Sequence, residues 1–337
     1  MPSALWKVIA FVLILFLILY ASNTLSTLRG YMAGGASLFI GGNTIPANII
    51  PTYDGLDEKP YTPTKQNNTH KGQRKLLLSE IDFLTGRDAD WCIYAGAAPN
   101  NKGAILADMF PKTRFVFVDP REFNIRPVDG IKVKSATVKS IDTKSDVNIY
   151  TIQDLFTTDM AKALKKLLKG RVVFISDIRT NKEMEYPTDS DILYNSAQQF
   201  NWVTALKPHS SMLKFRLPFR NDDSLFIMND EIQEEFDDSK AHGIDFESDY
   251  ANNVFKFMDG EVRLQAWAPR SSTETRLIVE GKQTKDIVAY DNNYEDKMFY
   301  FNSVERSKNA DNIIEKHILD EYNSTYNKNV TSKSIKV

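Results

Sequence analysis

A lysine, an aromatic residue and an arginine alternate within a strand-like run of the sequence, residues 206–219. On an extended segment successive side chains point to opposite faces, so Lys214 and Arg216 share one face and Phe215 occupies the other. A lysine beside a second cation, in a site that excludes water, releases its proton more readily and can act as a base near neutral pH. A solvated edge strand would show the same alternation, so other parts of the chain must decide between the two interpretations.

Two aspartates directly follow predicted strands. Asp119 comes after the apolar run 114–118, and Asp177 comes after the run 171–176. Open α/β sheets bind their ligands at the carboxyl ends of the strands, so we expect both carboxylates to face one crevice. A carboxylate in that position can accept hydrogen bonds from ribose hydroxyls.

A turn of small residues, 94–103, separates an earlier predicted strand from a helix and contains Gly96. The succession of strand, tight turn, helix and strand ending in an acid is the opening of a nucleoside-binding, doubly wound α/β fold. The turn has no G-x-G-x-x-G pattern, which disfavours a dinucleotide pyrophosphate. A ligand without phosphates, such as S-adenosyl-L-methionine, fits better.

Other elements should surround this sheet. A helix beginning near Gly72 carries Leu77, Ile81 and Leu84 at i, i+4 and i+7, so one stripe of it should be buried. The remaining expected elements are helices over 104–110, 160–169, 190–199 and 293–302, a strand over 202–207, and an alternating strand over 271–279 that carries Glu274. Beyond Arg306 the charged, Asn-rich chain is expected to fray.

The net charge of -2 hides an asymmetry. Residues 222–249 hold eleven acids against Lys240, so the rest of the chain carries about +8, a sign that suits an anionic partner such as nucleic acid. The single cysteine, Cys92, excludes an internal disulfide and is expected to be a buried, inert thiol. The four histidines show no ligand spacing, so we expect no structural metal.

Residues 4–21 are almost uninterruptedly apolar, and Trp6 and Tyr20 flank the run. Its length predicts a transmembrane anchor, while a cleaved signal peptide is the alternative. The charges on either side leave the orientation open. Residues 22–68, rich in Gly, Pro, Asn and Thr, are expected to form a tether.

Six short blocks, in order, resemble the poxvirus-type cap-specific mRNA 2′-O-methyltransferases, which in poxviruses also serve as the small subunit of poly(A) polymerase. The blocks are Lys-Leu-Leu-Leu from Lys75, Tyr-Ala-Gly-Ala-Ala-Pro at 94–99, Ile-Ser-Asp-Ile-Arg at 175–179, Leu-Lys-Phe-Arg-Leu-Pro-Phe at 213–219, Ala-Pro followed by Glu-Thr-Arg-Leu, and Asn-Tyr-Glu-Asp-Lys-Met from Asn293. The resemblance spans about residues 70–305. It implies a Rossmann-like doubly wound sheet of the S-adenosylmethionine-dependent methyltransferase type, here with an N-terminal transmembrane helix, and a large DNA virus as source.

The resemblance also implies roles for individual residues. The family's catalytic Lys-Asp-Lys-Glu tetrad falls on Lys75, Asp177, Lys214 and Glu274. The methyl-donor residues would be Tyr94, Gly96, Ala97, Pro99, Asp119 and Arg121. Recognition of the cap and RNA would use Arg216, Phe219 and Glu295, with Tyr53 or Tyr61 as a second aromatic. Asn100 departs from the family, which has glycine there; asparagine tolerates positive φ better than most residues.

The expected organisation is an anchor at 4–21, a tether at 22–68, a methyltransferase domain at 69–306 with an acidic insertion at 222–258, and a polar tail at 307–337. The expected partners are capped mRNA, a membrane through residues 4–21, and viral transcription or polyadenylation proteins. The protein would be membrane-anchored, in the virion or the host cytoplasm. Two alternatives remain open: a membrane-anchored virion protein that keeps the fold as an RNA-binding or structural module, and an enzyme that methylates a small molecule or protein.

Overall fold

A computed structural model describes residues 72–180, 187–220, 226–269, 272–290 and 293–335. The predicted anchor at 4–21, the predicted tether at 22–68, and both Tyr53 and Tyr61 lie outside the described residues.

The membrane assignment needs correction. Among the described residues no helix combines the length and the apolar character needed to cross a bilayer. The single-pass membrane anchoring predicted from residues 4–21 is therefore not supported, and neither is a membrane partner.

Within the described ranges, eight strands form the central sheet in the order β3-β4-β2-β1-β5-β6-β9-β8. They are β1 (Trp91–Ala95), β2 (Arg114–Val118), β3 (Val133–Ser135), β4 (Ile149–Ile152), β5 (Val172–Ser176), β6 (Ser210–Phe215), β8 (Glu261–Arg263) and β9 (Thr275–Glu280). Neighbouring strands from β3 to β6 pair in parallel, whereas β9 pairs antiparallel to β6 and β8 antiparallel to β9. A separate antiparallel pair joins β7 (Phe255–Met258) to β10 (Ile287–Tyr290). The predicted α/β architecture with a large central sheet is confirmed.

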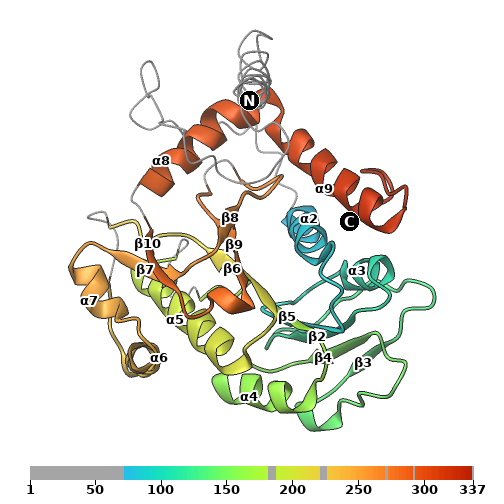
Figure 1. The fold of residues 1–337 in the computed structure, drawn as a ribbon, viewed down its shortest axis with the longest axis horizontal. Helices are drawn as coiled ribbons and strands as arrows, with labels where there is room; N and C mark the ends of the chain where they lie inside the picture. Colours follow the sequence, from blue (N-terminus) through green and yellow to red (C-terminus); the bar gives the residue numbers. More distant parts are fainter. Residues whose placement is uncertain (1–71, 181–186, 221–225, 270–271, 291–292, 336–337) are drawn as a thin grey trace, which may run out of the picture.

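Parallel neighbours need crossover connections, and helices supply them on both faces of the sheet. The helices are α2 (Gly72–Leu84), α3 (Gly103–Met109), α4 (Thr158–Leu167), α5 (Asp189–Leu206), α6 (Asp230–Ala241), α7 (Phe246–Ala251), α8 (Asn293–Tyr300) and α9 (Ala310–Tyr326). Short helical turns are η1 (Val138–Ser140), η2 (Gly281–Gln283), η3 (Phe301–Glu305) and η4 (Arg306–Lys308), of which η3 is a π-helix. Figure 1 shows α2, α3 and α9 on one side of the sheet and α4 and α5 on the other.

The sequence explains where several helices begin and end. Thr157 accepts a hydrogen bond from the amide of Met160 at the start of α4, and Thr188 forms a capping box with Asp191 at the start of α5. Gly170 follows α4 with φ +88°, a conformation that favours glycine.

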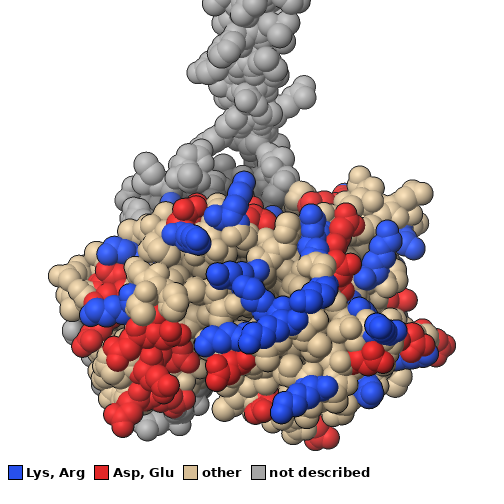
Figure 2. Space-filling model, turned by 60° about the horizontal axis from the view of Figure 1, so that its bottom comes forward, with Lys and Arg blue, Asp and Glu red and all other residues tan. Residues whose placement is uncertain are grey.

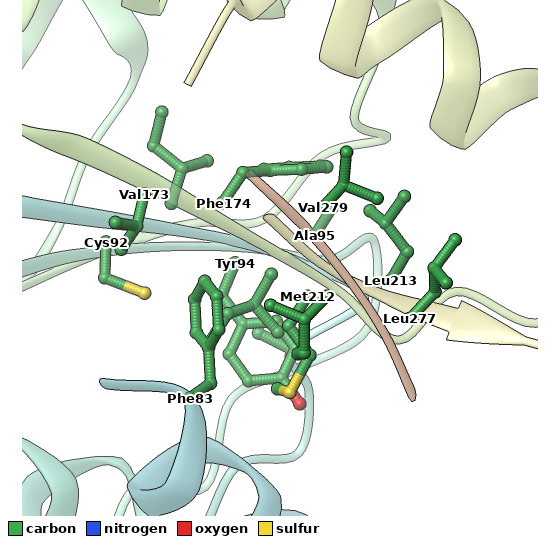
Figure 3. Packing of buried hydrophobic residues seen from close by; sticks show 14 of the residues in the cluster. Phe83, Cys92, Tyr94, Ala95, Val173, Phe174, Met212, Leu213, Leu277 and Val279 are labelled. Carbon is green, nitrogen blue, oxygen red and sulfur yellow. The ribbon is translucent and has the colours of Figure 1, made fainter. Parts of the chain in front are cut away.

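The main core lies between the sheet and its two helical layers. The predicted stripe of α2 is buried: Leu77 and Ile81 are fully covered and Leu84 is 2% exposed. Figure 3 shows Phe83, Cys92, Tyr94 and Met212 on one side of the sheet and Phe174, Leu213, Leu277 and Val279 on the other. Burial raises the pKa of the Cys92 thiol well above its usual value, in agreement with the prediction of an inert cysteine.

The prediction of a strand over residues 202–207 was wrong. Residues 202–206 end helix α5 and are not part of a strand; Lys207, at φ 51°, closes that helix, and the strand begins at Ser210. The apolar residues of this segment pack as one helical face against the sheet, and an apolar run of that length fits either structure.

The region beyond Arg306 is not a frayed tail. It contains the 17-residue helix α9, and Ile314, Ile318 and Leu319 of that helix are buried. Tyr322 donates a hydrogen bond to the carbonyl of Met109, across 2.8 Å, which fixes α9 against α3. The apolar residues recur at helical spacing among charged ones, and this periodicity outweighed the polar composition.

The acidic stretch also folds. It forms α6, α7 and β7, and Ile232, Phe236 and Phe246 are buried beneath their acidic exteriors. Several of its acids, among them Glu234, Asp237 and Glu247, are exposed on this ordered substructure, which packs on α5.

Candidate active site

Four charged side chains from four elements meet at the carboxyl edge of the central sheet. Asp177 follows β5, Lys214 lies near the end of β6, Glu274 precedes β9, and Lys75 projects from α2. The ammonium of Lys214 lies 3.2 Å from Asp177 Oδ1 and 3.2 Å from Glu274 Oε2. The ammonium of Lys75 lies 3.2 Å from Glu274 Oε1. The structure thus brings together all four residues of the predicted tetrad, which are scattered over two hundred positions of sequence.

The strand pairing explains this convergence. Strand β6 runs between β5 and β9, so the end of β5, the end of β6 and the beginning of β9 fall on the same edge. Lys214 extends past the last β5 pair, and the side chain of Gln199 replaces that neighbour: it accepts from the Lys214 amide and donates to the Lys214 carbonyl, each across 3.0 Å. These two bonds fix the backbone of Lys214 beyond the edge of β5.

Two arginines that sequence reasoning missed complete the cluster. Arg276 is 2% exposed and donates to Asp177 Oδ1 across 2.8 Å, and its guanidinium lies 3.5 Å from Glu274 Oε1. Arg179 is more exposed and donates to Glu274 Oε2 across 3.0 Å. A signal for Arg276 was present, because Glu274 and Arg276 are two residues apart on an extended segment and must share a face.

The charges around the two acids strongly favour their ionised forms. Burial alone would raise the pKa of Asp177, but Arg276 and Lys214 outweigh it and hold the value at about 2. Burial opposes ionisation of Glu274 too, yet the cations around it, with Lys214 and Lys75 contributing most, keep its pKa well below the usual value. Burial lowers the pKa of Lys75, against the attraction of Glu274.

With two carboxylates and four cations, the cluster has an excess of positive charge. Among the described residues, Nε and Nη1 of Arg276 are buried without a hydrogen-bond partner. A site of this composition destabilises an additional proton and attracts an anionic or electron-rich group.

Helix α9 braces the helix that carries Lys75. Arg74, the neighbour of Lys75, donates to both carboxylate oxygens of Glu315 on α9, at 3.1 and 2.5 Å. The indole of Trp267 donates to the same carboxylate across 2.5 Å. The C-terminal helix therefore helps to set the position of Lys75 at the cluster.

The predicted methyl-donor residues lie around the turn after β1. Gly96 has φ +77°, and a Cβ there would lie 2.8 Å from the backbone carbon of Asp177, so the turn and the end of β5 touch closely. Asp119 is 3% exposed and accepts from the amide of Ala98 across 3.0 Å. Arg121, whose side chain is 68% exposed, donates hydrogen bonds to both carboxylate oxygens of Asp119. Ala97 is buried and Pro99 exposed in the same turn.

Tyr94, in β1, and Asn100, in the turn that follows it, are both buried. Tyr94 lies in the core, 2% exposed and edge-on to Phe117, and burial raises its pKa well above the usual value. Asn100 adopts φ 43°, the positive φ that glycine would supply, and both polar atoms of its buried side-chain amide lack a partner among the described residues. Asn100 therefore adopts the positive φ expected at a position where the resembling family has glycine.

The predicted cap residues lie beside the cluster. The Arg216 guanidinium stacks 3.9 Å from the ring centroid of Phe219, and the Phe219 amide donates to Asp189 across 2.6 Å. Burial raises the pKa of Glu295 to about 7, against the opposing attraction of Arg216. Arg216 and Lys214 both line a small pocket with Glu274, which agrees with their shared face.

Residues 51–233 match the family described as "Poly A polymerase regulatory subunit". The chain is 28% identical over 273 residues to the "Cap-specific mRNA (nucleoside-2'-O-)-methyltransferase" of Myxoma virus (strain Lausanne), covering 75% of this chain and 68% of that protein. It is also 28% identical over 273 residues to the protein of the same name from Fowlpox virus (strain NVSL), covering 75% of each chain.

Proposed function

Because the chain belongs to the family of poly(A) polymerase regulatory subunits, we propose that it is a cap-specific mRNA 2′-O-methyltransferase that methylates the first transcribed nucleotide of capped viral mRNA. The observation that carries the proposal is the meeting of Lys75, Asp177, Lys214 and Glu274 at the ligand-binding edge of the sheet. The sheet order, with parallel strands followed by the antiparallel β9, supports a fold of the S-adenosylmethionine-dependent methyltransferase type.

The residues around β1 and β2 fit S-adenosyl-L-methionine, the donor this chemistry requires. The close turn at Gly96 brings backbone to the end of β5, and the unpartnered amide of Asn100 could bond a polar ligand. Asp119 stands where a ribose would be held, once its hydroxyls displace the exposed Arg121 side chain. When bound there, the sulfonium supplies an electrophilic methyl group.

The tetrad and its arginines would then activate the acceptor. A ribose 2′-hydroxyl is a poor nucleophile that must approach the methyl carbon in line, so positioning supplies much of the rate. Bound S-adenosylmethionine would supply the methyl group, and Nζ of Lys214, as an uncharged amine, would accept the proton that the hydroxyl loses. Glu274 and Asp177 hold that nitrogen from two sides at 3.2 Å, and Arg276 fixes Asp177.

The cap would be gripped next to this centre. Phe219 offers an aromatic face for the positively charged methylated guanine, and Glu295 offers a carboxylate to accept hydrogen bonds from the base edge. Arg216 would lie near the RNA backbone. Asp189 accepts from the amides of both Phe219 and Arg220, which holds the loop that presents the aromatic ring.

We further propose that the protein associates with a poly(A) polymerase, as its family membership suggests. That role does not depend on the methyltransferase site and can be assayed separately by co-purification with the polymerase of the same virus.

The decisive experiment supplies the full-length protein with radiolabelled S-adenosylmethionine and short RNA carrying a cap-0 end. We expect label on the 2′-oxygen of the first nucleotide, none on the uncapped RNA, and none from Lys214→Ala. Equal labelling of capped and uncapped RNA would contradict cap recognition and favour another acceptor. Absence of both labelling and donor binding by calorimetry would instead favour a non-catalytic RNA-binding or structural protein.

A further inference from the structure

A large groove lies at the amino edge of the central sheet, away from the candidate active site. Its volume is about 1510 Å³. Its walls come from α4, the end of α5, the residues before β5 and β6, and the residues after β9. The groove and the reactive cluster therefore occupy opposite ends of the same three strands, β5, β6 and β9. With five or six residues in each strand, the two sites are separated by roughly 15–20 Å of sheet.

The groove is predominantly cationic. The lysines and arginines on its walls are Lys162, Lys165, Arg171, Lys207, Lys282 and Lys285. Two acids, Glu280 and Asp238, also line the groove. Glu280 already pairs with Arg87 across 2.8 Å, so its charge is compensated. Figure 2 turns toward the viewer the side that lies at the bottom of Figure 1, around α4: lysine and arginine side chains form a band across it, with acidic side chains gathered beside them.

These cations are poorly compensated. Within the described ranges, Lys165, Lys207, Lys282 and Lys285 are exposed and form no ion pair with a carboxylate, while Lys162 makes only an exposed contact of 3.4 Å with Asp159. Partial burial and the neighbouring Lys207 lower the pKa of Lys165. Like charges held together in this way attract a polyanion, because its binding relieves their repulsion and releases counterions.

The groove holds one of these lysines in an unfavourable backbone conformation. Lys207 ends α5 at φ 51°, a position where glycine or asparagine is more favourable. The chain therefore has a cation at a point where helix termination alone would select a different residue.

We propose that this groove binds the phosphodiester backbone of single-stranded RNA downstream of the capped end. A recessed channel accommodates a polymer strand better than a planar anionic bilayer. The hydroxyl of Thr204 on its wall adds a hydrogen-bond donor for phosphate oxygens. That the bound RNA is the same transcript that is methylated rests on the proposed function. That the groove binds RNA does not rest on it.

The test compares the full-length wild type, a groove variant and a control variant by fluorescence anisotropy. The probe is an uncapped single-stranded RNA of about 30 nucleotides, longer than the ~4–16 nucleotides that a single OB fold covers. The groove variant carries Lys207→Asn, Lys282→Gln and Lys285→Gln. The control variant loses three exposed lysines elsewhere, through Lys134→Gln, Lys139→Gln and Lys144→Gln. Both variants lose the same charge, so nonspecific electrostatics cannot separate them.

The groove variant should bind the RNA about tenfold or more weakly than the control, and its dependence of log affinity on log salt should become shallower by about 2, since each phosphate contact on a single strand contributes about 0.7. Thermal unfolding of both variants monitors the fold, and Lys207→Asn should not lower stability. Equal RNA binding by the two variants would overturn the proposal. The proposal would also be overturned, in favour of a membrane surface, if the groove variant bound RNA normally but no longer bound phosphatidylserine vesicles.

Methylation of a short capped RNA tests the proposed function separately from RNA binding by the groove. The groove variant should methylate that short RNA as the wild type does, because none of its three substitutions touches the reactive cluster. If no protein methylates RNA but the difference in RNA binding persists, the proposed function fails and the groove stands. If methylation proceeds and the two variants bind RNA equally, the groove proposal alone fails.

Discussion

Arg276 donates to the carboxylate of Asp177 across 2.8 Å while only 2% of the arginine is exposed. The two residues are 99 positions apart in the sequence and sit on strand ends that are not direct neighbours, β9 and β5. Their contact spans β6, and it places a permanent positive charge behind the carboxylate that Lys214 also contacts. Arg276 therefore helps to set the ionisation of the whole cluster.

Replacing Arg276 with methionine should destabilise the protein by about 1.5–3 kcal/mol, because it removes a charged hydrogen bond from Asp177, which still keeps Lys214 as a partner. Arg276→Lys, which keeps the charge but loses the planar fork, should cost less. Urea unfolding monitored by circular dichroism measures both changes. A free energy of unfolding unchanged in Arg276→Met would show that the pair does not hold the cluster together.

The stability of the protein should fall as acid protonates Asp177. Its pKa in the folded protein, about 2, lies below the ordinary value of 3.8, so the stabilisation is complete above about pH 4 and is lost as pH falls toward 2. The difference corresponds to roughly 2 kcal/mol. Urea unfolding across this pH range should show a smaller loss of stability for Asp177→Asn than for the wild type, with Glu274 contributing to both in the same direction. Parallel pH profiles of the two proteins would contradict this assignment.

Removing the Lys214 amino group should slow methyl transfer strongly without abolishing donor binding. Lys214→Ala takes away the group placed to receive the hydroxyl proton, a role typically worth about 10²–10⁴ in rate, whereas the predicted donor residues lie on the turn after β1. Methyl transfer to short capped RNA measures the first effect, and calorimetry with S-adenosylmethionine measures the second. Lys139→Ala is the matched control, an exposed lysine of η1 away from both the cluster and the groove, and should keep full activity. Turnover by Lys214→Ala within about tenfold of the wild-type rate would exclude Lys214 as the proton acceptor.

Binding of a 7-methylguanosine cap analogue should strengthen as pH rises toward 7. The pKa of Glu295 is about 7, raised mainly by burial, so the carboxylate is protonated in acid and ionises only as that pH is approached. If the ionised form accepts hydrogen bonds from the base, affinity below pH 7 should change by up to about tenfold per pH unit. Glu295→Gln should bind more weakly and show a flatter profile over the same range. Identical profiles would place the titrating group elsewhere.

Local patterns in the sequence predicted much of the framework. The i, i+4, i+7 stripe of α2, the acids after β2 and β5, and the small-residue turn around Gly96 follow from side-chain periodicity and backbone conformation, which depend on near neighbours. The same reasoning failed at residues 202–206, because a short apolar run is buried equally well on a helix or a strand. It failed again at α9, where polar composition hid a buried face that only packing against α2 and α3 makes stable.

By itself, the sequence determined the α/β class and, through its resemblance to a known family, the four residues Lys75, Asp177, Lys214 and Glu274. Tertiary structure alone decided which charges surround them: Arg276 and Arg179 at the cluster, Glu315 behind the helix of Lys75, and the cationic groove at the opposite ends of the same strands. The reason is physical. Ion pairing and burial depend on distances through space between residues far apart in the chain, and those distances exist only after β5, β6 and β9 have paired.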